Sequence, residues 1–204
     1  MNLEQELYLN DNEIKYEIEH TDGLEIVSET ENIIEVVDTF QENNRFLRFN
    51  KESYLVNEEM IEDFGQNLKE CRILEYLQML PKILLMNVRK IYIVSTSEHL
   101  EQLEDETGIY TFDLFNKGMY VWENGNIIIS LAAHENESEL LSHQELEEEG
   151  QTDYDENLRI AVWKTIAREL FHSLQSNPLF EDDIEQGEEV VEDFCEMFFS
   201  PTYA

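Results

Sequence analysis

Three residues near the C-terminal end of the chain have the types and the spacing of a metal-dependent hydrolytic site, with one substitution. Arg168, Glu169 and His172 stand in the order Arg-Glu-x-x-His. With histidine in the first position, two histidines one helical turn apart would bind zinc, and the glutamate between them would activate a water molecule. Arginine has no lone pair to offer a metal ion. The spacing therefore indicates a zinc site that has lost one ligand.

These residues fall on the polar side of a predicted helix that runs from about residue 156 to residue 175. At about 100° per residue, Arg168 and His172 lie opposite a broad apolar stripe, and Glu169 lies at its margin. The stripe consists of Trp163, Ile166, Ala167, Leu170, Phe171 and Leu174. A narrow polar strip on a mostly apolar helix is what a buried site requires. Three ordinary surface residues would give the same short pattern, so the motif alone does not decide the function.

The C-terminal segment makes the comparison more specific. Residues 188–195 read Glu-Glu-Val-Val-Glu-Asp-Phe-Cys and are followed by Phe198, Phe199 and Pro201. Together with the motif helix, this segment resembles the ImmA/IrrE family of metallopeptidase-like proteins. The ligand-bearing helix of that family reads E-x-x-A-[DN]-x-F-A, then two bulky apolar residues and a proline. On that pattern Glu188 is the third zinc ligand and Glu192 is the acid that supports it.

A second register of the same segment is open, because the pattern of thermolysin-like enzymes, N-E-x-x-[AS]-D, would instead select Glu189 and Asp193. Helix geometry distinguishes the two registers. The predicted buried stripe of this last helix, residues 185–199, consists of Val191, Phe194, Cys195 and Phe198. Glu188 and Glu192 lie at the edge of this stripe, whereas Glu189 and Asp193 point nearly opposite, to solvent. We therefore expect Glu188 to be the ligand.

Arg168 changes what the resemblance implies for the metal. His172 and Glu188 alone make a two-ligand site, whereas protein zinc sites use three or four protein ligands, so zinc should bind weakly or not at all. His134 and His143 are alternatives for the missing ligand, but we expect both to be solvated loop residues. The guanidinium of Arg168 is expected instead to pair with the carboxylates of the last helix, Glu188 or Glu192, and so replace the metal bridge.

The remaining predicted elements follow in the order that the resemblance implies. They are three short strands, a helix, a strand and a hairpin, at residues 24–28, 33–37, 46–49, 57–80, 90–95 and 118–130. The hairpin prediction rests on Asn124-Gly125 between two apolar runs, and the helix prediction rests on apolar residues at every third or fourth position. In the family, the last strand before the motif helix lies along the substrate cleft. The resemblance gives this place to residues 126–130.

The fold class predicted from these elements is α+β. We expect residues 57–204 to form a zincin-like metallopeptidase domain, in which a small mixed sheet packs on the motif helix and on the glutamate-bearing helix. Residues 1–56 are expected to form a β-rich region packed on that domain, because their alternating apolar residues need a surface to cover. The resemblance itself covers roughly residues 82–203.

Acidic residues dominate the composition of the 204-residue chain, with 47 Asp and Glu against 13 Lys and Arg and a formal net charge of −34. This charge repels nucleic-acid phosphate and anionic membranes, and it favours basic protein partners. No apolar run approaches the ~20 residues of a membrane-spanning helix. The N-terminus lacks the basic flank and apolar centre of a signal peptide. We expect a cytoplasmic protein in which Cys71 and Cys195 are reduced.

Three functions fit the sequence, and we favour the first. It is a degenerate metallopeptidase, or pseudoenzyme, that binds a protein or peptide through the former substrate cleft. The second is an active zinc-dependent peptidase with a substituted ligand, in which Glu169 deprotonates a zinc-bound water that attacks a peptide carbonyl. The third is an acidic inhibitor that mimics DNA and occupies the basic groove of a nucleic-acid-binding protein.

Overall fold

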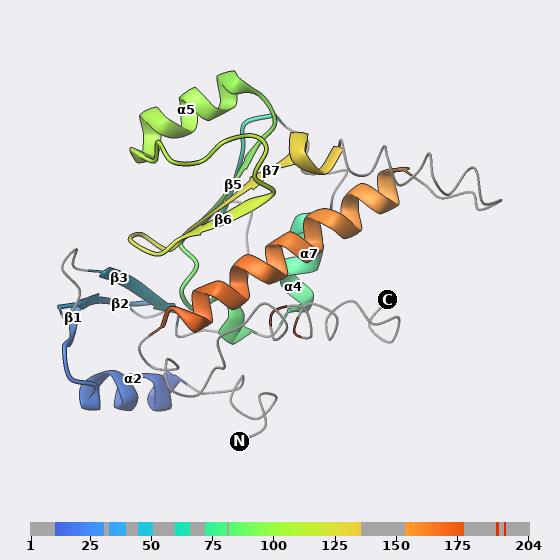
Figure 1. The fold of residues 1–204 in the computed structure, drawn as a ribbon. Helices are drawn as coiled ribbons and strands as arrows, with labels where there is room; N and C mark the ends of the chain where they lie inside the picture. The colour runs from blue at the N-terminus through green and yellow to red at the C-terminus, as the bar shows by residue number, and fades with distance from the viewer. Residues whose placement is uncertain are drawn as a thin grey trace.

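The chain folds into a mixed α+β structure with two sheets (Figure 1). The computed structural model describes residues 11–30, 33–39, 45–50, 60–65, 72–80, 82–135, 154–177, 191 and 194. Its elements are, in chain order, α2 (Asp11–His20), β1 (Leu24–Glu29), β2 (Ile33–Asp38), β3 (Arg45–Asn50), β4 (Ile61–Asp63), α4 (Ile73–Met79), η2 (Lys82–Leu85), β5 (Lys90–Val94), α5 (Ser97–Thr107), β6 (Gly118–Val121), β7 (Asn126–Ser130) and α7 (Tyr154–Gln175). The α+β class predicted from the sequence is confirmed.

The larger sheet has the strand order β4-β5-β7-β6. Strands β4, β5 and β7 are parallel, and β6 is antiparallel to β7 at the end of the sheet. Side chains alternate between the two faces of a strand, so β5 and β7 send Ile91, Ile93, Ile127 and Ile129 to one face and Tyr92, Val94 and Ile128 to the other. Helix α7 covers the first face and α5 covers the second (Figure 1).

Helix α7 is the longest described helix and is held along the sheet by a continuous apolar side. Its core residues are Leu158, Val162, Ile166, Ala167, Leu170, Phe171 and Leu174. Trp163 stacks on Tyr76 of α4, with ring centroids 4.7 Å apart and planes inclined by 11°. At the other end, the Asn87 side chain donates to the Ser173 carbonyl at 2.9 Å, and Asn177 donates to Asn87 at 3.2 Å. These buried hydrogen bonds fix the C-terminal end of α7 against the start of β5.

The turn between β6 and β7 is the one predicted from Asn124-Gly125. Gly125 has φ 70°, a left-handed conformation that favours glycine. A side chain at this position would also overlap the carbonyl oxygen of Asn87. The Gly125 carbonyl accepts a hydrogen bond from the Arg89 N–H at 2.7 Å, so the turn is tied to the strand beside it.

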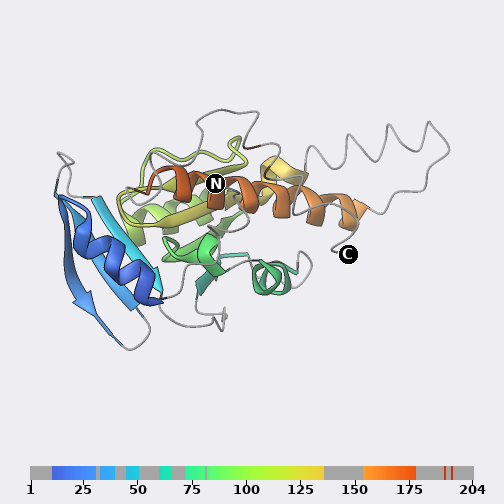
Figure 2. The same cartoon turned by 90° about the horizontal axis from the view of Figure 1, so that it is seen from below.

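The smaller sheet contains β1, β2 and β3 in antiparallel order, as the three β-rich segments predicted. Figure 2 shows α2 lying along this sheet, and Lys15 of α2 forms an ion pair with Glu29 of β1 at 3.0 Å. The buried side chains of this sheet, Ile34, Val36, Leu47 and Phe49, belong to the same apolar cluster as the core side of α7. Ile18 of α2 belongs to the same cluster, so α2 contributes to the burial of this sheet.

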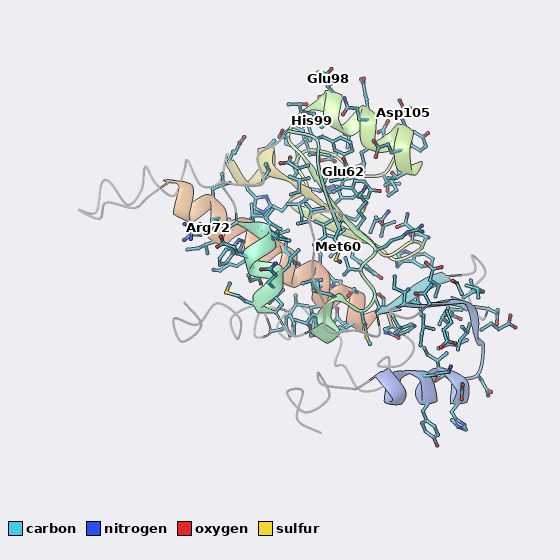
Figure 3. All side chains as sticks on the ribbon, turned by 180° about the vertical axis from the view of Figure 1, so that it is seen from behind. Met60, Glu62, Arg72, Glu98, His99 and Asp105 are labelled. Carbon is cyan, nitrogen blue, oxygen red and sulfur yellow. The ribbon has the colours of Figure 1, made fainter. Side chains whose placement is uncertain are left out.

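The predicted helix over residues 57–80 was wrong in its first part. The described residues there form strand β4, and the end of the range is helical, as α4; residues 57–59 and 66–71 lie outside the described residues. Strand β4 pairs with β5, and its Glu62 forms an ion pair with Lys90 at 2.6 Å (Glu62 is labelled in Figure 3). Apolar residues at every third or fourth position suited a helix, but pairing with a buried strand decided the local structure.

Helices α2 and α5 were not predicted. The ends of α5 carry recognisable signals, because the Thr96 hydroxyl accepts from the His99 N–H at 3.2 Å and Gly108 ends the helix with φ 72°. Helix α5 has few apolar residues, so the sequence shows no clear helical periodicity there. Among the described helices, none has the length and apolar character needed to cross a membrane.

Candidate functional site

The three motif residues of α7 differ in exposure. Glu169 is buried, with 6% of its surface exposed. Arg168 is exposed and His172 is half-buried. The imidazole Nδ1 of His172 lies 2.9 Å from the side-chain oxygen of Gln175, one turn further along the helix. The polar strip predicted for this helix therefore exists, and its glutamate is the most enclosed of the three residues.

Strand β6 closes over the polar strip at Gly118. A Cβ atom built on Gly118 would lie 2.5 Å from the Cγ2 of Thr165 and 3.1 Å from the Cγ of Glu169. Real Cβ atoms do not approach other heavy atoms so closely, so a glycine at this position allows the strand to contact the helix. This contact could not be predicted from the sequence, in which Gly118 is the first residue of the predicted hairpin.

The carboxylate of Glu169 accepts a hydrogen bond from the backbone N–H of Tyr120 in β6. Burial raises the pKa of the Glu169 carboxyl above its ordinary value of 4.5, while the nearby His172, the Tyr120 N–H and Arg168 act to lower it. Loss of water around the carboxylate is the largest of these effects. The glutamate is thus a buried acid that is held by the strand above it.

The Tyr120 N–H lies on the outer edge of the larger sheet. The Ser130 N–H donates to the Lys117 carbonyl at 3.0 Å, which makes these two residues a hydrogen-bonded pair of the antiparallel ladder. Such pairs alternate along a strand, so Lys117 and Met119 turn their backbone groups toward β7, whereas Gly118 and Tyr120 turn theirs outward. Glu169 therefore accepts a hydrogen bond from the Tyr120 N–H, a group with which an additional strand would otherwise pair.

The expectation that residues 126–130 would offer an open edge along a substrate cleft was wrong. Asn126–Ser130 is β7, which is paired with β5 on one side and with β6 on the other, so it has no open edge. Strand β6, Gly118–Val121, lies at one end of the described sheet, and β4 lies at the other. The sequence showed a hairpin but not which of its two strands would pair with β5, because that choice depends on long-range parallel pairing.

His134 was expected to be a solvated loop residue, and this expectation was wrong. Its side chain is fully buried. Residues 131–135 form a helical turn whose start is capped by Ser130, since the Ala133 N–H lies 3.4 Å from the Ser130 hydroxyl. The ring Nδ1 lies 2.6 Å from the Ser130 carbonyl, and Nε2 lies 2.8 Å from the Thr165 hydroxyl on α7. His143, the other alternative ligand, lies outside the described residues.

The contacts of His134 define its protonation pattern. A carbonyl oxygen only accepts, so Nδ1 carries the proton that is donated to Ser130. In the neutral ring, Nε2 then accepts from the Thr165 hydroxyl. The ring therefore links the end of β7 to the polar strip of α7, one turn before Glu169. A serine directly after a strand was the only sequence signal for this cap.

Two residues of the last predicted helix, Val191 and Phe194, are among the described residues. Val191 and Phe194 are helical, and each has 2% of its surface exposed, as expected for the predicted buried stripe. The ring of Phe194 contacts that of Phe171, with centroids 4.5 Å apart. Phe171 belongs to the apolar side of α7, so this contact packs Phe194 against the core side of the motif helix. Glu188 and Glu192 lie outside the described residues, as does their predicted pairing with Arg168.

No family model, curated protein or solved structure matches the chain. The resemblance to ImmA/IrrE proteins therefore depends on the residues and their arrangement alone. Within the described part of the chain, no three His, Cys, Asp or Glu side chains gather as a metal-binding group. The proposed set of His172 and Glu188 includes a residue beyond that part, so the zinc site stays a prediction.

Hydrolysis at a zinc site would make specific demands on Glu169 and on the residue at position 168. A general base in a zinc site has to reach a metal-bound water. Here the carboxylate of Glu169 is buried and bonded to the backbone of Tyr120. Arg168 offers no lone pair one turn away. What the site presents outward is the edge of β6, with Glu169 beneath it.

Proposed function

We propose that this protein is a degenerate metallopeptidase-like protein that binds an extended segment of a protein partner along the edge of β6. The observation that carries the proposal is the hydrogen bond from the Tyr120 N–H to the Glu169 carboxylate. This bond joins Glu169, the residue that would activate water in a complete zinc site, to β6, the strand that would contact a substrate.

The order and packing of the elements support the metallopeptidase-like part of the proposal. The motif helix α7 lies against one face of a mixed sheet, and its polar strip is turned to the antiparallel strand β6. Phe194, six residues after the candidate third ligand, packs on Phe171 of the motif helix. These are the relations that a site built from His172, Glu169 and Glu188 would require.

The non-hydrolytic part of the proposal is supported by two residues. Arg168 stands where the first metal ligand would be and cannot bind zinc. Glu169 is buried and accepts a hydrogen bond from the Tyr120 N–H, so its carboxylate is oriented toward β6. Together they favour a site that has kept the shape of a peptidase and lost its chemistry.

Partner binding is supported by the geometry of β6. Gly118 and Tyr120 direct their backbone groups outward, and addition of an extended peptide to such an edge is a common mode of recognition. The Tyr120 N–H is bound by the Glu169 carboxylate, which an added strand would have to displace. The net charge of −34 favours partners whose added segment is basic. The predicted partner is therefore a basic protein segment in extended conformation.

A peptide selection combined with hydrogen exchange tests the proposal. Peptides selected from a random display library on the full-length protein should protect the Gly118 amide from exchange. They should bind several-fold more tightly to Glu169→Ala, which frees the Tyr120 N–H. Glu19→Ala, at an exposed position of α2, is the matched control and should bind as the parent does. Peptides that protect no residue of β6, or that are cleaved when zinc is added, would refute the proposal.

A further inference from the structure

Two aromatic side chains stand out on the loop between α5 and β6, residues 108–117. Phe115 has 90% of its surface exposed and Tyr110 has 70%, more than any other large apolar side chain of the described residues. Phenylalanine is among the residues most often buried in folded proteins. The two rings leave this loop with an apolar outer side that the core does not use.

The loop is not an unanchored segment. Ile109 and Phe112 are buried in the apolar cluster beneath α5, and Leu114 packs against that cluster. The inner side of the loop therefore has its own apolar anchors. The exposure of Phe115 and Tyr110 is therefore not a consequence of a poorly packed loop.

The turn that carries Phe115 is held by hydrogen bonds on both sides. The Asp113 carboxylate accepts from the Phe115 N–H at 2.8 Å and from the Asn116 N–H at 3.2 Å. The Leu114 carbonyl accepts from the Ser130 hydroxyl at 2.8 Å. A side chain on such a turn loses less backbone entropy when it is bound than one on a free loop. The exposed ring is thus presented in a preorganised position.

The neighbouring surface is acidic. Helix α5 contains no Lys or Arg, and it exposes Glu98, Glu101, Asp105 and Glu106. In Figure 3, Glu98 and Asp105 project from α5 away from the sheet. Both α5 and the loop cover the same face of the larger sheet. A molecule that contacts Phe115 therefore approaches a strongly negative surface.

We propose that the loop 108–117 and the outer side of α5 form a docking surface for a basic protein segment, with Phe115 as the apolar anchor. Aromatic residues surrounded by polar contacts are the usual energetic centre of protein interfaces. The negative surroundings select a positive partner and speed its approach. A second copy of this chain would bring two acidic surfaces together, and an anionic bilayer would be repelled. This surface lies outside the strip around Glu169 and does not depend on the function proposed for that strip.

The test uses a display library of amphipathic peptides rich in Lys, Arg, Leu and Trp, selected on the full-length protein. Peptides that bind should lose affinity about tenfold or more in Phe115→Ser, the effect of removing an interface anchor. Tyr16→Ser removes another exposed aromatic, on α2, with 59% of its surface exposed, and should leave the affinity unchanged. Glu98→Lys combined with Asp105→Lys should weaken binding and reduce its dependence on salt.

Three results would overturn this proposal. In the first, the selected peptides bind Phe115→Ser as tightly as the parent. In the second, Phe115 governs binding to zwitterionic lipid vesicles instead, which would make the ring a membrane contact. In the third, sedimentation shows self-association that is lost in Phe115→Ser, which would make the surface a contact between copies.

Discussion

The Glu169 carboxylate and the Tyr120 N–H join the motif helix to the outermost described strand of the larger sheet. The bond crosses from α7 to β6 at the point where Gly118 allows the two backbones to approach. It places a buried acid at one of the two residues of β6, Gly118 and Tyr120, whose backbone groups turn outward. The stability of the site and its binding behaviour should therefore respond together to changes at this bond.

The pH dependence of stability should reveal the buried carboxyl group of Glu169. Because its pKa in the folded protein is raised above 4.5, the folded state keeps a proton that the unfolded chain has released. The free energy of unfolding should fall as pH rises from the ordinary pKa through the raised one. Glu169→Gln removes this titration, so its stability relative to the parent should increase over the same range in urea unfolding. Parallel pH profiles for parent and variant would contradict the assignment, and Glu98→Gln is the exposed control.

The close approach of β6 to α7 predicts a specific steric conflict. Gly118→Ala places a methyl group 2.5 Å from the Thr165 Cγ2, so it should destabilise the fold by about 1–3 kcal/mol. Thr165→Ser removes that Cγ2 and keeps the hydroxyl, so the double variant should recover part of the loss. Chemical denaturation of the four proteins gives the coupling. Additive losses would mean that β6 and α7 are not in contact there.

The contact between His134 and Thr165 predicts a loss of folding stability when the Thr165 hydroxyl group is removed. Thr165→Val keeps the shape of the side chain but leaves the buried Nε2 of His134 without its donor, at a cost of about 1–3 kcal/mol. Thr165→Ser should cost less, because the hydroxyl remains. Long-range ¹H–¹⁵N spectra should show the neutral ring with its proton on Nδ1. A ring with its proton on Nε2 and none on Nδ1 would exclude the proposed contacts.

The placement of the last helix predicts a large effect of one aromatic side chain. Phe194 is buried against Phe171, so Phe194→Ala should lower the free energy of unfolding by about 3–5 kcal/mol. Phe115→Ala, at the most exposed phenylalanine, should change it by about 0.5 kcal/mol or less. Similar stabilities of the two variants would show that the last helix does not pack beside the motif.

The sequence predicted best the features that depend on local spacing. The apolar side of α7, the hairpin at Gly125 and the buried positions Val191 and Phe194 follow from periodicity and turn chemistry. It failed where distant segments decide the outcome. The strand β4 is fixed by its pairing with β5, and the edge position of β6 is fixed by the pairing of β7.

The candidate site shows the same division. The spacing of Arg168, Glu169 and His172 on one helix could be read directly. The partners of that strip could not, because Gly118, the Tyr120 N–H and His134 reach it from other elements. Backbone donors have no signature in a sequence, and the burial of His134 depends on the whole fold around it.

Zinc binding by Arg168→His tests the central claim most directly. If α7 and the last helix are the two halves of a degenerate zinc site, this one change supplies the missing ligand beside His172 and Glu188. After dialysis against micromolar zinc, the variant should hold about one equivalent of chelator-resistant metal, and its melting temperature should rise with zinc. The parent should hold far less, and Arg168→His combined with Glu188→Ala should lose the gain. A variant that binds no more zinc than the parent, or a parent that already binds a full equivalent, would contradict the account.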